Sequence, residues 1–180
     1  AKSCRKASDF FGIIQRIYTT FANSTKRWQL LKNNITGVTL KSLSATRWES
    51  RVDCVKAIRI QLPEIREALL QVAENDKDPS TSSEAQSLAE NDLCGFEFLV
   101  SIIIWYEILS AINLISKELQ SKDMLIDIAI ESVKGLISFF TKYRESGFSK
   151  ALEDAKEIAL EMDIHPEFRT KRKIKRRRQF

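Results

Sequence analysis

The chain is poor in helix-breaking residues. Its 180 residues include only five glycines and three prolines. That scarcity argues against a protein of many short strands and turns, and it favours helices with short connections. With 43% hydrophobic and 29% charged residues, the composition is that of a soluble globular domain large enough to bury one core.

The chain also has few residues of the kinds that form metal sites and catalytic centres. Cys4, Cys54 and Cys94 are an odd number at wide spacings, which fits neither a disulfide framework nor a zinc knuckle, and which favours a reducing compartment. The single histidine, His165, precedes a proline and has no ligand cluster beside it, so we predict a surface histidine and no metal site. No glycine-rich phosphate loop or G-x-S-x-G motif is present. The sequence therefore offers few residues that could catalyse a reaction if this segment acted as an independent enzyme.

Hydrophobic spacing predicts an all-α fold, a bundle of about seven to eight helices. Phe10, Ile14, Ile17 and Phe21 recur as on the buried face of a helix. A later helix is expected to stop at Pro63, whose ring suits the first turn of the next one. Residues 75–83 are polar and are predicted to form a loop, with a capping-box spacing at its end that opens a short helix. Two further helices, 124–143 and 148–162, are expected to be separated at Gly147.

The most apolar part of the chain, 93–119, is predicted to be the central helix of the bundle. Glu97 and Glu107 interrupt it, so its uncharged stretch is about half of the roughly 20 residues that a bilayer requires. A helix that is apolar nearly all round is then expected to be surrounded by other helices. We therefore predict no membrane partner.

Positive charge is concentrated at the C-terminus. Eight of the 29 basic residues lie between positions 169 and 178. The other 21 basic and 24 acidic residues give the rest of the chain a net charge of −3. We predict a helical domain over 1–168 and a disordered basic tail over 169–180, suited to phosphate contact or nuclear import. Its basic residues are Arg169, Lys171, Arg172, Lys173, Lys175, Arg176, Arg177 and Arg178.

One short stretch combines a helix start with a cation and an aromatic ring. Thr46 and Glu49 have capping-box spacing, which places Arg47 and Trp48 in the first helical turn. A helix N-terminus suits a phosphate, and an indole beside a guanidinium suits a nucleobase. The alternative is that Trp48 is a core aromatic and Arg47 a solvated charge.

Several segments, in order, resemble one family. They are Phe10 through Trp28, Thr46-Arg47-Trp48, the apolar helix 96–106, "INLISKELQSKDM" at 112–124 and "KGLISFFTKYRESGF" at 134–148. Together they resemble the hAT superfamily of cut-and-paste DNA transposases, and more narrowly its domesticated relatives among MYM-type and TTF-type zinc-finger proteins. The resemblance covers nearly the whole chain.

The resemblance implies a helical domain inserted into the family's RNase H-like core, within a longer protein. It further implies that Arg47 and Trp48 approach a transposon end, with the indole stacking on a flipped base. The expected partner is DNA, in the nucleus, with a homo-oligomeric parent protein and no small-molecule substrate. The family's Asp, Asp and Glu carboxylates cannot be placed in this chain, so no cofactor is expected here, and divalent metal is expected only in the missing core. Whether the parent protein is an enzyme stays open, and the alternative is an inactive nuclear scaffold for protein–protein interaction.

Overall fold

The structure is a computed structural model that describes residues 4–43 and 48–168. The described residues form seven α-helices and one π-helical turn, with no strand among them, so the predicted all-α class and the helix number are confirmed. In chain order the elements are α1 (Arg5–Ala22), α2 (Thr25–Asn34), α3 (Trp48–Ile60), α4 (Leu62–Asn75), α5 (Pro79–Ser87), η1 (Leu88–Asp92), α6 (Phe96–Leu119) and α7 (Ile126–Glu161).

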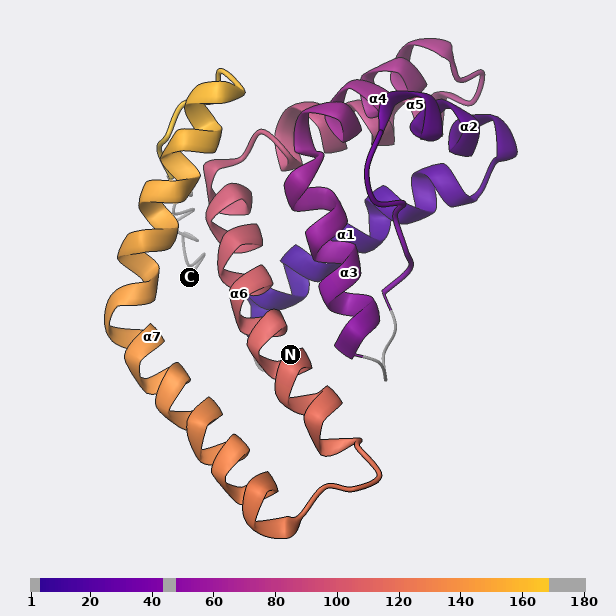
Figure 1. Cartoon of the computed structure of the whole chain (residues 1–180). Coiled ribbons are helices and arrows are strands. Elements are labelled where there is room, and N and C mark those ends of the chain that lie inside the picture. The colour runs from indigo at the N-terminus through magenta and orange to yellow at the C-terminus, as the bar shows by residue number, and fades with distance from the viewer. Residues whose placement is uncertain (1–3, 44–47, 169–180) are drawn as a thin grey trace, which may run out of the picture.

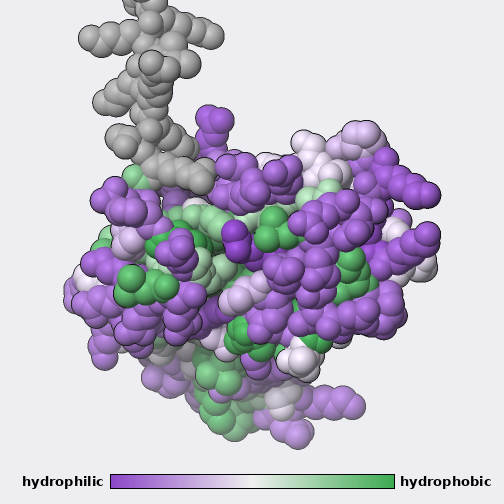
Figure 2. Space-filling model, turned by 90° about the horizontal axis from the view of Figure 1, so that it is seen from above, coloured by the Kyte–Doolittle hydropathy of each residue, from purple (hydrophilic) through white to green (hydrophobic). Residues whose placement is uncertain are grey.

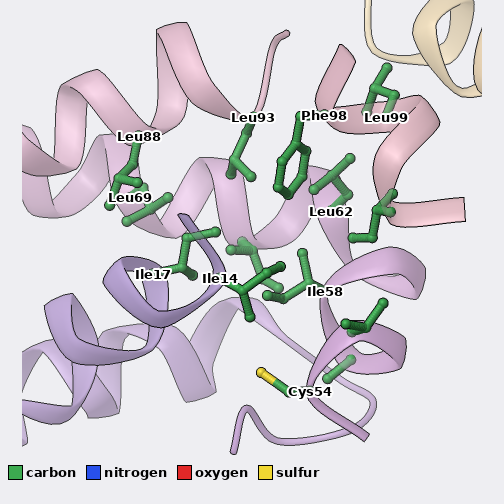
Figure 3. Close-up of a cluster of buried hydrophobic side chains, with 14 of the residues drawn as sticks. Ile14, Ile17, Cys54, Ile58, Leu62, Leu69, Leu88, Leu93, Phe98 and Leu99 are labelled. Atoms are coloured by element: carbon green, nitrogen blue, oxygen red, sulfur yellow. The ribbon is translucent and has the colours of Figure 1, made fainter. Parts of the chain in front are cut away.

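The hydrophobic core lies where α1, α3, α4, η1 and the first half of α6 meet (Figure 3). The four apolar residues predicted for the buried face of α1 are all buried in it. Its largest fully buried side chains include Ile14, Ile17, Phe21, Leu31, Ile58, Leu62, Ile65, Leu69, Leu88, Leu93, Leu99 and Ile102. Each such side chain contributes about 1.5–3 kcal/mol by leaving water, so this cluster is the main source of stability.

The predicted central helix is central over only part of its length. The fully buried residues of α6 all lie between Phe96 and Leu109. Beyond them α6 runs beside α7, and the closed end of this hairpin extends away from the other helices (Figure 1). By length and composition α6 could also cross a membrane, although one third of its most apolar window is buried inside the protein and a core helix passes the same test.

The predicted helix end at Gly147 is wrong. Helix α7 continues without a break from Ile126 to Glu161, and no described glycine has a positive φ. Gly147 is buried, and a Cβ there would lie 2.5 Å from Cδ2 of Tyr143, one turn earlier. A glycine fits at position 147 because the Tyr143 ring lies against the helix there and leaves no room for a side chain.

The predicted loop over 75–83 is also shorter than expected. Helix α5 begins at Pro79, and Asp78 caps it by accepting hydrogen bonds from the backbone N–H groups of Ser80 and Thr81. The capping box predicted later in this segment is therefore not the start of the helix. By contrast, Pro63 lies in the first turn of α4, as predicted.

A buried glutamine holds the connection between α2 and α3. Gln61 donates from Nε2 to the carbonyls of Val38, at 2.7 Å, and Ala57, at 3.0 Å. Its Oε1 accepts from the N–H of Gly37 at 2.8 Å. Because buried polar groups require partners, this amide fixes the path of the loop that leads toward α3.

The face of the molecule seen from above is mainly hydrophilic, with apolar residues exposed between hydrophilic ones (Figure 2). A salt bridge from Arg16 of α1 to Glu84 of α5, at 2.5 Å, and to Asp92 of η1, at 3.2 Å, joins these elements at the surface.

Candidate nucleic-acid interface

Trp48 lies on the surface at the start of α3. It is 44% exposed and does not belong to the hydrophobic core. The interpretation of Trp48 as a core aromatic is therefore wrong. Thr46 and Arg47 lie outside the described residues, so the predicted capping box and the Arg47 side chain are not placed.

Arg51 lies one helical turn after Trp48 and contacts its ring. The guanidinium carbon is 5.6 Å from the centroid of the Trp48 ring and also 5.6 Å from that of Phe11 on α1. A cation over an aromatic face contributes about 0.5–1 kcal/mol at an exposed site. Arg51 therefore links the exposed indole to α1.

Phe11 continues this contact into the core. Its ring is 4.8 Å from that of Trp105 on α6, and Trp105 lies stacked at 6.3 Å from Phe10. Phe10 is buried, with its ring 5.6 Å from Phe98. The exposed indole is thus connected, through the Arg51 guanidinium, to a series of aromatic contacts that leads into the core.

Charges of both signs surround this site. Glu49 in the first turn of α3 pairs with Lys117 of α6 at 2.7 Å. Lys41 pairs with Asp53 at 2.7 Å, and this hydrogen bond raises the pKa of Lys41. In each pair the carboxylate offsets the ammonium, so the described residues around Trp48 do not form a strongly basic surface, and an incoming phosphate would have to compete with these carboxylates.

The other predicted features are the basic tail, the histidine, the absence of a metal site and the cysteines. The basic tail residues 169–178 lie outside the described residues. His165 is exposed, with Nδ1 4.0 Å from Oε1 of Glu167. Within residues 4–43 and 48–168, no group of three or more potential ligands could hold a metal ion. The three cysteines are free, with Cys54 buried and Cys4 exposed.

Sequence reasoning had not singled out Arg51 as a site residue. Its spacing of three residues from Trp48 on a helix is the signal that could have found it, because residues at i and i+3 lie on one face. The contacts of Arg51 with Phe11 and of Glu49 with Lys117 join distant segments, and no local pattern indicates them.

The chain was compared with protein-family models, curated proteins and solved structures, and none of them matches it. The resemblance to hAT transposases therefore stays a prediction from the sequence.

Proposed function

We propose that this chain is a DNA-contacting helical insertion domain of a hAT-type transposase or of a protein derived from one. In this proposal Trp48 stacks on a base extruded from distorted DNA, and Arg47 contacts a neighbouring phosphate. The observation that supports it best is the exposed indole of Trp48 at the start of α3, which contacts the guanidinium of Arg51. The indole at this position presents exposed aromatic surface, which is the kind of surface on which an unpaired base can stack.

The geometry suits stacking more than sequence reading. Arg51 lies against the Trp48 ring and restrains the indole before any base arrives, which reduces the entropy lost on binding. A base stacked on an aromatic ring contributes about 1–3 kcal/mol, whereas extruding a base costs a few kcal/mol. Trp48 would therefore stabilise a base that is already flipped in distorted DNA, and it would not flip one alone.

Phosphate attraction would come from two sources. Locally, the N–H groups at the start of α3 and the positive end of its dipole favour an anion beside Trp48. The basic tail supplies eight further positive charges, while the rest of the chain carries a net charge of −3. Most of the salt dependence of binding is then expected to come from the tail, and most of the preference for distorted DNA from Trp48.

No catalysis is assigned to this chain. The hydrolysis and strand-transfer chemistry of the resembled family uses three carboxylates and divalent metal on a core that this segment does not contain. We also propose that the protein acts in the nucleus, where it would bind transposon ends or other distorted DNA.

The test is binding of a labelled DNA hairpin and of the matching intact duplex at two salt concentrations. The proteins are the full chain, a chain ending at Phe168, and Trp48→Ala in both. Ile60→Ala is the matched control, because Ile60 is also an exposed apolar residue of α3. We expect Trp48→Ala to reduce the preference for the hairpin by about tenfold and Ile60→Ala to leave it unchanged. Equal hairpin preference for wild type and Trp48→Ala would contradict the proposal.

A nuclear scaffold for protein–protein interaction is the second candidate. The exposed apolar residues on the first half of α7 favour it, because contiguous apolar surface is typical of protein interfaces. The two candidates differ in what the surrounding reading frame encodes: catalytic carboxylates on both sides of this segment would favour the transposase, and their loss would favour the scaffold.

A further inference from the structure

The first half of α7 carries an apolar surface wider than α6 can cover. The half-buried residues Ala129, Leu136 and Phe140 follow the spacing of one helical face, the face that lies against α6. A second row of large apolar residues lies beside it, 40–78% exposed. This row, named here the α7 stripe, consists of Ile126, Ile130, Val133 and Ile137.

The spacing within the α7 stripe is that of a helix–helix interface. Its residues are separated by four, three and four positions, the alternation of the core positions in a coiled coil. The closed end of the α6–α7 hairpin extends away from the other described helices (Figure 1). None of the other described helices therefore covers this row, and its four branched side chains are left in water.

We propose that a second copy of this chain covers the α7 stripe, with the two α7 helices packed antiparallel about a twofold axis. A twofold contact uses the same surface on both copies, so one self-complementary row is sufficient. In this arrangement the two α6–α7 hairpins lie with their α7 helices side by side. The α7 stripe does not include Trp48, so the proposal does not depend on the proposed function.

The charges beside the stripe favour this arrangement. Asp127 directly follows Ile126, and Lys134 directly follows Val133, so both carboxylate and ammonium lie along the same edge of the row. In an antiparallel pair such equivalent edges face each other. Asp127 of one copy then lies opposite Lys134 of the other, and twofold symmetry produces this pairing twice. Lys134 is exposed and pairs with Glu131 of its own helix at 2.7 Å, so Asp127 of the other copy would share this ammonium with Glu131.

The first experiment is sedimentation equilibrium of the full chain over a range of concentrations. A contact of this length buries less than a standard interface of about 800 Å² per partner, so we expect a dimer with a dissociation constant of about 1–100 µM. Ile130→Lys places two charges in the interface and should weaken the dimer at least about 100-fold. Leu160→Lys is the matched control, because Leu160 is an exposed residue of the same helix far from the stripe, and it should dimerise as wild type.

The second experiment tests the antiparallel pairing by charge reversal. Asp127→Lys and Lys134→Asp should each weaken self-association about threefold to tenfold, because like charges then face each other. Mixing these two variants restores opposite charges and should recover wild-type affinity in the mixed dimer. Circular dichroism and thermal unfolding of each variant establish that it is folded.

Three results would overturn the proposal: a monomeric wild type at about 100 µM, open-ended assembly in place of a dimer, or an Ile130→Lys variant that dimerises as wild type. A monomeric wild type would indicate that a different protein or a lipid surface, and not a second copy of this chain, covers the α7 stripe.

Discussion

The side-chain oxygen of Gln61 accepts a hydrogen bond from the backbone N–H of Gly37 at 2.8 Å, and a Cβ on Gly37 would lie 2.8 Å from the same oxygen. Each of the two residues therefore depends on the other. The glycine leaves room for the amide, and the buried amide satisfies the glycine backbone and two further carbonyls. This contact holds the loop that leads toward the start of α3, where Trp48 is exposed.

Gln61→Leu should destabilise the protein by about 2–3 kcal/mol, because a Gly37 donor and the carbonyls of Val38 and Ala57 lose their partner in a buried place. Urea unfolding followed by circular dichroism measures this. Gln86→Leu is the control, since Gln86 is exposed and bonds only weakly to Glu90, at 3.4 Å or more. Equal loss in both variants would show that the Gln61 hydrogen bonds contribute no special stability.

Two glycines of α7 should respond oppositely to alanine. Gly135 has no atom near its Cβ position, so Gly135→Ala should stabilise the protein by about 0.5–1 kcal/mol through helix propensity alone. At Gly147 the new methyl would meet the Tyr143 ring, so Gly147→Ala should destabilise it by about 1–3 kcal/mol despite the same gain in propensity. Thermal unfolding of the pair measures the difference. Stabilisation by both would mean that the Tyr143 ring moves aside easily.

Trp48→Ala should have a moderate effect on stability, about 1–2 kcal/mol, because the residue is 44% exposed and loses part of its burial together with its contact with Arg51. Phe21→Ala, which empties a fully buried site, should cost about 3–5 kcal/mol. A double-mutant cycle between Trp48 and Arg51 isolates their interaction. A large loss from Trp48→Ala would indicate a structural role and weaken its assignment to DNA.

Stability should fall in alkaline solution because of one buried thiol. Burial raises the pKa of Cys54 from 9.0 to about 12, so its contribution is complete below pH 9 and is lost as pH rises toward 12. The unfolded thiol ionises first, so the free energy of unfolding should drop by about 1.4 kcal/mol between pH 8 and pH 10. Cys54→Ala should remove most of this drop, measured by urea unfolding at the two pH values; a smaller part remains because burial also raises the pKa of Tyr143. Cys4→Ala, at an exposed cysteine, should retain it.

Local sequence patterns were sufficient for much of the fold. The spacing of Phe10, Ile14, Ile17 and Phe21 depends only on which residues share a helical face, and all four are buried as predicted. Pro63 marks a helix start because its ring restricts the local backbone, whatever surrounds it. The class of the fold and the number of helices follow from such patterns.

The tertiary structure decided what depends on distant neighbours. Glycine is the residue type expected at a helix end, yet α7 continues through Gly147, because α7 packs along α6 and the Tyr143 ring occupies the space that a larger side chain at 147 would need. The sequence left the exposure of Trp48 open, since a tryptophan near a helix start often packs in a core but can also lie at the surface. It lies at the surface with the Arg51 guanidinium against its ring, and Arg51 in turn contacts Phe11 of a separate helix. Local spacing specifies a helix and its apolar face, but only packing determines which part of that face another element covers.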